Sequence, residues 1–365
     1  RQMTYAEALN LGMRREMEAD PNVFVFGVDC QDFKRTFDSG KGMVEDFGPM
    51  RYLGSPISES GATGMAIGAA LCGLRPIHIH ARADFVLLAM NQLINMASTK
   101  AYLSNGKLSV PMVVRIMIGR SWGQGPQHSK AMYSIFAHFP GLKVVCPSNP
   151  QDAYSLLRTA IRDDNPVLFF EHRWCYDLVG DVDDELIIPI GQCALRRPGS
   201  DVTIVATSWM VVEAMQAAEI LARHRVHAEV IDVRSIAPLD MDIINASVKR
   251  TGRVIIVDND WSFCGLSAEI AAQVTESCWG FLRQPPLRIG FAPVPCPTAR
   301  PLEDLFYPTA KDIVRVAERM NKRLIIDMTA NGMFGTEASE IDLSREVWNT
   351  YECHTTREVT PTRSF

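Results

Sequence analysis

The sequence predicts an α/β protein of two doubly wound domains, each with a mostly parallel sheet and helices on both faces. Short apolar runs alternate with longer stretches of helical periodicity. The runs are continuous, as is typical of strands that are buried on both faces. The alternation stops once and then resumes, and in a chain of 365 residues this interruption indicates two domains.

The first alternating region opens with a helix, because Thr4 and Glu7 form a capping box and Leu9, Met13 and Met17 recur at a four-residue spacing. Strands are expected at the apolar runs 23–28, 76–80, 111–118, 143–146 and 166–171. Helices are expected between them at 61–73, 85–104, 129–138 and 150–162.

The second alternating region follows a segment of acidic residues, Gly and Pro. Its strands are expected at 202–206, 228–232 and 254–257, and its helices at 209–224, 240–250, 266–277 and 309–320. We expect a first domain over 1–185, a linker over 186–200, a second domain over 201–322 and an extension over 323–365. The extension has little periodicity, so we expect it to be partly disordered or packed on a partner.

The composition excludes some classes of function. With 47% apolar and 22% charged residues the chain is globular, and a net charge of −5 provides no basic field for nucleic acid. No apolar run reaches the about 18 residues that span a bilayer, and the first residues do not resemble a signal peptide. We therefore expect no nucleic-acid or membrane partner and a cytoplasmic location.

Metal sites built from cysteine or histidine are not favoured. The nine cysteines include no CxxC pair. His78 and His80 would share one face of a strand, but no third ligand is evident beside them, so packing at the strand end is the simpler interpretation.

The segment SPISESGATGMAIGAALCGLRP is the most unusual in the chain. A lone carboxylate, Glu59, precedes a helix in which Gly61, Gly64, Gly68 and Ala69 have almost no side-chain bulk. Taken alone, these residues favour a closely packed helix with an acidic residue at its positive end. A dry pocket that holds a functional carboxyl is the alternative.

The chain resembles the beta subunit of the thiamine-diphosphate-dependent 2-oxo-acid dehydrogenase component, a transketolase-like family of pyruvate, branched-chain and acetoin dehydrogenases. The resemblance extends over 3–320. It rests on these segments in this order: PISESGATGMAIGAALCGLRP, DFVLLAMNQLIN, GQGPQHS, PGLKVVCPSNPQDAYSLLRTAIRDDNPVLFFEHR, IDVRSIAPLD and KRTGRVIIVDND. It implies a thiamine pyrimidine-binding domain followed by a transketolase C-terminal-type domain.

The resemblance also implies roles for three residues. The family's glutamate that matches Glu59 hydrogen-bonds a pyrimidine nitrogen of the cofactor and promotes its imino tautomer, which requires a buried acid. Phe85 matches an aromatic residue that packs on the pyrimidine ring, although its residue type alone would suggest a core position. His128 matches a histidine that faces the thiazolium and the lipoyl group, and otherwise it would be an ordinary loop histidine.

A potassium site is implied by the segment AIRDDNP, with ligands at Met112, Ala160, Ile161, Asp163 and Asn165, mainly through backbone carbonyls. A helix C-terminal turn would have the same sequence. The chain departs from the family at three other positions: Ile79 and Asn91 replace frequent acidic residues, and Leu88 stands where pyruvate-type members often carry glutamine. The identity of the substrate therefore stays open.

The sequence contains no Gly-Asp-Gly segment, with which thiamine-diphosphate enzymes bind diphosphate and magnesium. The resemblance therefore implies an alpha-type partner that carries this segment and holds most of the magnesium site, in an assembly of two alpha and two beta chains. The expected reaction decarboxylates a 2-oxo acid such as pyruvate and transfers the acyl group to a lipoyl acyltransferase. A split transketolase-like or acyloin-forming carboligase is the alternative. A non-catalytic scaffold is a third possibility, against which the retained Glu59, Phe85 and His128 argue.

Overall fold

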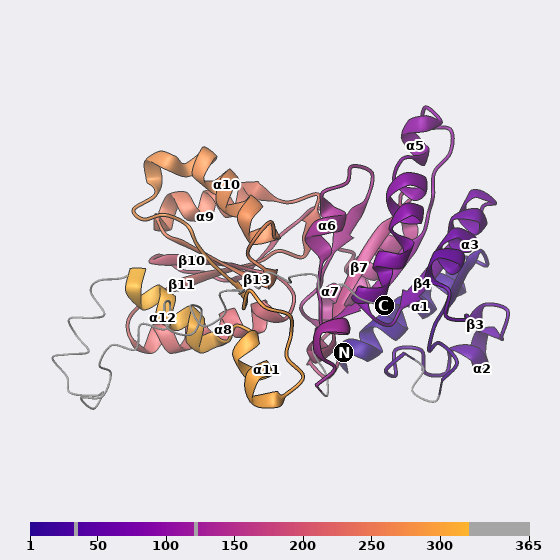
Figure 1. Cartoon of the computed structure of the whole chain (residues 1–365), viewed down its shortest axis with the longest axis horizontal. Helices are drawn as coiled ribbons and strands as arrows, with labels where there is room; N and C mark the ends of the chain where they lie inside the picture. The colour runs from indigo at the N-terminus through magenta and orange to yellow at the C-terminus, as the bar shows by residue number, and fades with distance from the viewer. Residues whose placement is uncertain (33–35, 120–122, 321–365) are drawn as a thin grey trace, which may run out of the picture. The chain divides into compact units, whose positions relative to one another are not determined.

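The larger sheet is formed mainly by the first half of the chain in the computed structural model, which describes residues 1–32, 36–119 and 123–320 (Figure 1). Its strand order is β12-β6-β7-β5-β4-β2-β3, and among the described strand pairs within this sheet only that of β12 with β6 is antiparallel. The strands are β2 (Val23–Gly27), β3 (Tyr52–Gly54), β4 (Arg75–His80), β5 (Val113–Ile118), β6 (Lys143–Val145), β7 (Val167–His172) and β12 (Ser235–Ala237).

Helices cover both faces of this sheet, because the side chains of β2, β3, β5, β6 and β7 enter two separate apolar clusters. The helices are α1 (Tyr5–Ala19), α2 (Met43–Phe47), α3 (Glu59–Leu71), α4 (Ala83–Val86), α5 (Lys100–Leu103), α6 (Tyr133–Ala137) and α7 (Pro150–Arg162). The predicted capping box is present, since the Thr4 side chain accepts from the Glu7 N–H at 3.2 Å and the Glu7 carboxylate accepts from the Thr4 N–H at 2.7 Å.

The helix predicted over 85–104 is instead a series of short pieces: α4, a 3₁₀ turn (Leu87–Ala89), a π-helix (Asn91–Ala97) and α5. The Ser98 hydroxyl donates to the Ile94 carbonyl at 2.6 Å, and the Thr99 hydroxyl donates to the Asn95 carbonyl at 2.8 Å. Side-chain hydroxyls that bond the preceding turn compete with the regular backbone ladder, so the helix changes its winding here.

The second sheet has the order β14-β13-β10-β11-β9, with β9 antiparallel to β11. Its strands are β9 (Ala194–Arg197), β10 (Val202–Ala206), β11 (Ala228–Asp232), β13 (Val254–Trp261) and β14 (Leu287–Phe291). Its helices are α8 (Trp209–Arg223), α9 (Met241–Thr251), α10 (Leu266–Cys278), α11 (Arg300–Phe306) and α12 (Ala310–Met320). A separate pair joins β1 (Gln2–Thr4) to β8 (Val179–Asp181). Short 3₁₀ turns span Gly125–Gln127, Arg173–Cys175 and Trp279–Phe281.

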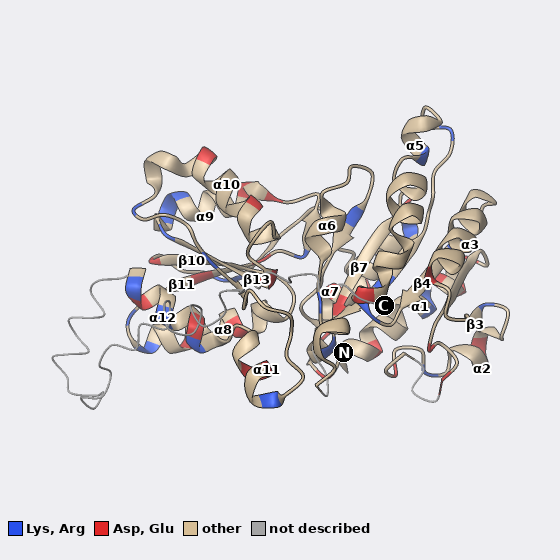
Figure 2. Cartoon of the chain, in the orientation of Figure 1, with Lys and Arg blue, Asp and Glu red and all other residues tan. Residues whose placement is uncertain are grey.

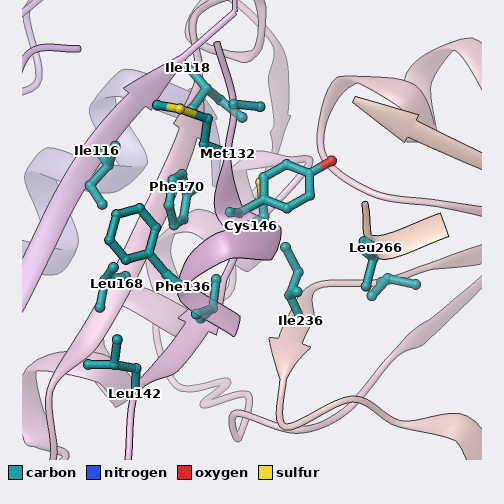
Figure 3. Packing of buried hydrophobic residues seen from close by; sticks show 14 of the residues in the cluster. Ile116, Ile118, Met132, Phe136, Leu142, Cys146, Leu168, Phe170, Ile236 and Leu266 are labelled. Atoms are coloured by element: carbon teal, nitrogen blue, oxygen red, sulfur yellow. The ribbon is translucent and has the colours of Figure 1, made fainter. Parts of the chain in front are cut away.

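The two halves of the chain share a core. β12 follows a strand of the second sheet but pairs with β6 of the first. Ile236 and Leu266 belong to the same buried cluster as Phe136 and Phe170. In Figure 3, Ile236 and Leu266 are to the right of Cys146. The predicted α/β fold with two doubly wound sheets is confirmed.

Two further predictions concern the linker and the extension. The predicted linker, 186–200, contains β9, which adds an antiparallel edge to the second sheet. The predicted extension, 323–365, lies outside the described residues. No helix in the described parts of the chain is long and apolar enough to cross a bilayer.

Candidate active site

A cavity of about 580 Å³ opens where β2, β3 and β4 end. Parallel strands leave a crevice at their carboxyl ends, and ligands of α/β proteins commonly bind there. The cavity brings together the three residues that the sequence singled out, Glu59, Phe85 and His128. Other residues around it follow directly on the strand ends: Val28, Asp29, Ser55, Pro56, Ala81 and Arg82.

Glu59 is the first residue of α3, so its carboxylate lies at the positive end of that helix. It carries the only charge of the helix, and in Figure 2 the α3 ribbon is tan along most of its length. Apolar residues of the same wall, Ile57 and Ala62, also line the cavity. A partly buried carboxyl group in this position can form a hydrogen bond with a ring nitrogen of a ligand.

The small residues of α3 have two different surroundings. Ala66 and Ala70 are buried against the sheet. A Cβ placed on Gly64 or Gly68, by contrast, would meet no atom of the described chain within 4 Å. The expectation of a closely packed helix is therefore met on one face only, and the glycine face leaves the backbone open to close approach.

Phe85 and His128 contact each other across the mouth of the cavity. Their ring centroids are 5.3 Å apart, and the ring planes are inclined by 78°, an edge-to-face arrangement. The Phe85 side chain is 37% exposed, so the residue is not part of the core. A half-exposed aromatic face beside an imidazole suits the stacking of a flat heterocycle.

The loop that carries His128 rests on the second half of the chain. Gly125 has a φ of +70°, and a Cβ on it would collide with Oγ1 of Thr298. Gly123 has a φ of +64°, and a Cβ on it would lie 2.7 Å from the Thr298 carbonyl oxygen. Both glycines are thus required by backbone conformation and by space. The spacing of the sequence motif contained no sign of this contact.

His78 and His80 line the inner wall of the cavity and were interpreted from sequence only as strand-end packing. They are 2% and 4% exposed. Burial lowers the pKa of His78 to about 4, and burial also lowers the pKa of His80 well below its usual value, so both rings are neutral at physiological pH. Nε2 of His80 lies 3.3 Å from the Thr63 hydroxyl of α3. Among the described residues, no three His, Cys, Asp or Glu side chains converge to hold a metal ion.

Asp29 and Arg82 complete the polar part of the wall. Burial raises the pKa of Asp29, and the nearby Asp32 carboxylate raises it further. Burial lowers the pKa of Arg82. Both residues follow the carboxyl end of a parallel strand, and this position in the sequence could have identified them as candidate site residues.

The residues predicted to bind potassium meet at the end of α7. The carbonyl oxygens of Ile161 and Asp163 each accept from Nη1 of Arg75 at 3.1 Å, and Lys143 pairs with the Asp163 carboxylate. The Asn165 N–H donates to the same carboxylate at 2.9 Å. The carbonyls of Ala160 and Met112 accept from the backbone N–H groups of residues 163 and 167. The ligand set is oxygen-rich but already faces two cationic side chains, so the potassium site stays a prediction.

The three departures noted in the sequence have different environments. Ile79 is buried, whereas Leu88 is 61% exposed and lines the cavity. Asn91 lies at the start of the π-helix and accepts from the Asn95 amide at 3.0 Å. Ile79 lines the cavity as well, so Leu88 is distinguished as the exposed departure on the cavity wall and Ile79 as the buried one.

Known proteins resemble this chain over most of its length. Residues 1–177 match the transketolase pyrimidine binding domain, and residues 191–313 match the transketolase C-terminal domain. The chain is 41% identical over 330 residues to the pyruvate dehydrogenase E1 component subunit beta-2, mitochondrial, of Oryza sativa subsp. japonica, covering 89% of this chain and 88% of that protein.

It is also 39% identical over 319 residues to the 2-oxoisovalerate dehydrogenase subunit beta of Bacillus subtilis (strain 168), covering 87% of this chain and 98% of that one. A solved structure described as a split gene transketolase, inactive beta4 tetramer, superposes with a TM-score of 0.71 at 20% identity, covering 87% of this chain and 97% of that chain. This last likeness shows the fold alone.

Proposed function

Because this chain belongs to the family of 2-oxo-acid dehydrogenase E1 beta subunits, we propose that it supplies the cofactor-activating half of a thiamine-diphosphate-dependent 2-oxo-acid dehydrogenase. The observation that carries this proposal is the position of Glu59, Phe85 and His128 on one cavity at the carboxyl ends of parallel strands. A scaffold without catalytic function would have no need to keep these three side chains together.

The cavity fits the aminopyrimidine ring of thiamine diphosphate. Its lining is mostly apolar, Phe85 offers an aromatic face, and Glu59 offers a carboxyl group at the edge. When bound, the cofactor supplies the nucleophilic carbon that a 2-oxo acid needs in order to lose carbon dioxide. The protein's contribution is to place the cofactor and to move protons around it.

Three side chains would perform this work. Glu59 would hydrogen-bond a ring nitrogen of the pyrimidine and so activate the cofactor. Phe85 fixes the plane of the ring through stacking. His128, beside Phe85, donates a hydrogen bond to the substrate carboxylate or carries a proton at the cavity mouth.

An alpha-type chain would complete the active site. Diphosphate and magnesium need a Gly-Asp-Gly segment that this sequence lacks, so we assign them to that partner, in an assembly of two alpha and two beta chains. The open glycine face of α3 suits a closely approaching neighbour. A lipoyl acyltransferase would accept the acyl group. A potassium ion near α7 and a cytoplasmic location stay predictions.

The dehydrogenase is favoured over the split transketolase-like or acyloin-forming carboligase because the relatives at about 40% identity are dehydrogenase subunits. These relatives are named for different substrates. Because the chain is 41% identical to one and 39% identical to the other, sequence identity does not decide between pyruvate and 2-oxoisovalerate as the substrate of this chain. The side chain of Leu88, which lines the cavity, is in a position to select between these substrates.

The test is to co-express the chain with its alpha-type partner and to measure turnover of a panel of 2-oxo acids, with a lipoyl domain or an aldehyde as acceptor. We expect acyl transfer to the lipoyl domain for at least one 2-oxo acid. Carbon–carbon bond formation with the aldehyde and no lipoyl acylation would favour the carboligase. Full activity of the single chain would contradict the need for a partner.

A further inference from the structure

An ion pair ties the His128 loop to the residue next to Phe85. Nζ of Lys130 lies 2.6 Å from Oδ1 of Asp84, and the Lys130 backbone N–H lies 3.4 Å from Oδ2 of the same carboxylate. The Asp84 side chain is 4% exposed and that of Lys130 is 32% exposed. Asp84 directly precedes Phe85, and Lys130 follows His128 by two residues.

The same ammonium group also closes the turn that contains His128. Nζ of Lys130 donates to the carbonyl oxygen of Pro126 at 2.6 Å. The His128 N–H lies 3.4 Å from the Gly125 carbonyl within this turn. The Lys130 ammonium group therefore links Pro126, two residues before His128, to the carboxylate of Asp84, which is next to Phe85.

We propose that Asp84 and Lys130 are positioning residues that set the His128 ring against Phe85 and thereby fix its place at the cavity mouth. The proposal rests on the function proposed above for His128. Neither residue lines the cavity, so they act on the reaction through His128. Misplacement of a reacting group by about 1 Å can lower a rate by about a hundredfold, which gives such a contact a measurable effect.

The two partners are not equivalent. Replacing Lys130 by Met leaves the buried Asp84 carboxylate without its cation, which is costly in a protein interior. Asp84→Asn keeps the shape of the side chain, and the freed Lys130 can reach water because it is partly exposed. We therefore expect Lys130→Met to disturb the loop more than Asp84→Asn, and Asp84→Asn to fold even if Lys130→Met does not.

The experiment is a double-mutant cycle with His128→Gln, measured on the complex with the alpha-type chain. We expect Lys130→Met to lower kcat by about tenfold or more while KM for the 2-oxo acid changes little, with Asp84→Asn intermediate. In the His128→Gln background, Lys130→Met should lower kcat no further, because its effect passes through the histidine.

A second measurement reads the geometry without turnover. In the full chain labelled with carbon-13 at the histidine Cε1 positions, the His128 signal is assigned by its loss in His128→Gln. We expect this signal to move in Lys130→Met and in Asp84→Asn. Removal of the ion pair should change how close the imidazole lies to the Phe85 ring, whose field shifts nearby nuclei.

Arg250 provides a matched control, because it also joins a largely exposed cation (57%) to a buried carboxylate, Glu229 (4%), but does so in the second half of the chain. Arg250→Met should lower stability and leave both kcat and the His128 signal unchanged. If Lys130→Met and His128→Gln lower kcat multiplicatively, Lys130 acts elsewhere and the proposal is wrong.

If His128→Gln keeps full activity, the role assigned to His128 under the proposed function is wrong. The positioning proposal is then decided by the carbon-13 signal alone. An unmoved His128 signal in both Asp84→Asn and Lys130→Met would overturn it.

Discussion

Burial decides the protonation of the histidine side chains on the inner wall of the cavity. His78 stacks on Phe26 with ring centroids 4.5 Å apart, and His80 meets His78 edge to face at 4.4 Å. A charged imidazole would lose its hydration in this position, so the neutral form is favoured. The inner wall of the cavity therefore carries no positive charge from these two histidines at physiological pH.

The histidines therefore predict a loss of stability in acid. The unfolded chain binds a proton at His78 near pH 6.5, whereas the folded chain does so only near its pKa of about 4. Stability present above pH 6.5 falls as the pH decreases toward 4, by up to about 3 kcal/mol from this residue. Urea unfolding of His78→Phe between pH 7 and pH 4.5 should show a smaller loss than the wild type. An equal loss in both proteins would contradict this account.

At the scale of elements, the loop that precedes α6 carries His128 and is anchored by contacts at both of its ends. Thr298 fills the space next to Gly125 on one side, and Asp84 holds Lys130 on the other. The helix predicted over 129–138 begins only at Tyr133, because residues 129 and 130 belong to this anchored loop.

Gly125→Ala should lower kcat without unfolding the protein. The φ of +70° is strained for alanine, and the added Cβ would collide with Oγ1 of Thr298, so the loop must move. We expect kcat to fall about tenfold or more while cofactor affinity changes less. Gly280→Ala is the control, because a Cβ there meets no described atom within 4 Å. Equal kcat values for Gly125→Ala and the wild type would show that the loop tolerates displacement.

Elements could be predicted from sequence where local signals are strong. The capping box at Thr4 is present, and the helix predicted over 150–162 is observed as α7. The winding changes of 85–104 and the pairing of β12 with β6 could not be predicted, because they depend on side-chain hydroxyls and on contacts distant in sequence.

The candidate site was predictable only in part, for a similar reason. Glu59, Phe85 and His128 lie in recognisable segments, and the structure places them around one cavity. The ion pair of Asp84 with Lys130 joins residues 46 positions apart, which no local pattern relates. The roles of the three site residues stay predictions until they are measured.

At the scale of the whole molecule, carboxylates of β13 join the two halves of the chain. The Tyr133 hydroxyl donates to Asp258, and the Ser134 hydroxyl lies 3.2 Å from Oδ2 of Asp260. Burial, together with the neighbouring Asp258 carboxylate, raises the pKa of Asp260 to about 7. Both acceptors are buried where the helix of one half meets the strand of the other.

This junction should weaken as the pH rises. The unfolded Asp260 loses its proton near pH 3.8, but the folded residue keeps its proton until about pH 7. The folded state therefore binds more protons in this window, and the contribution of Asp260 to stability falls from pH 4 to 7 and stays low above it. Asp260→Asn should flatten this dependence in thermal melts between pH 5.5 and 8. An unchanged slope would show that Asp260 titrates normally.

Potassium binding can be tested on the complex with the alpha-type chain. If the carbonyl oxygens at the end of α7 hold the ion, replacing potassium by choline at constant ionic strength should lower Tm, because a ligand that binds only the folded state stabilises it. The shift should disappear in Asn165→Ala only if that residue contributes a ligand. A Tm that is equal in both salts would remove potassium from the account.

The central claim is that Glu59 activates a cofactor whose diphosphate is held by another chain. The most direct measurement is the rate of hydrogen–deuterium exchange at the thiazolium carbon of thiamine diphosphate, in the complex with the alpha-type partner. We predict rapid exchange in the wild-type complex, and exchange no faster than that of free cofactor in the Glu59→Gln complex and in the isolated chain. Equally rapid exchange in the Glu59→Gln complex would contradict the claim.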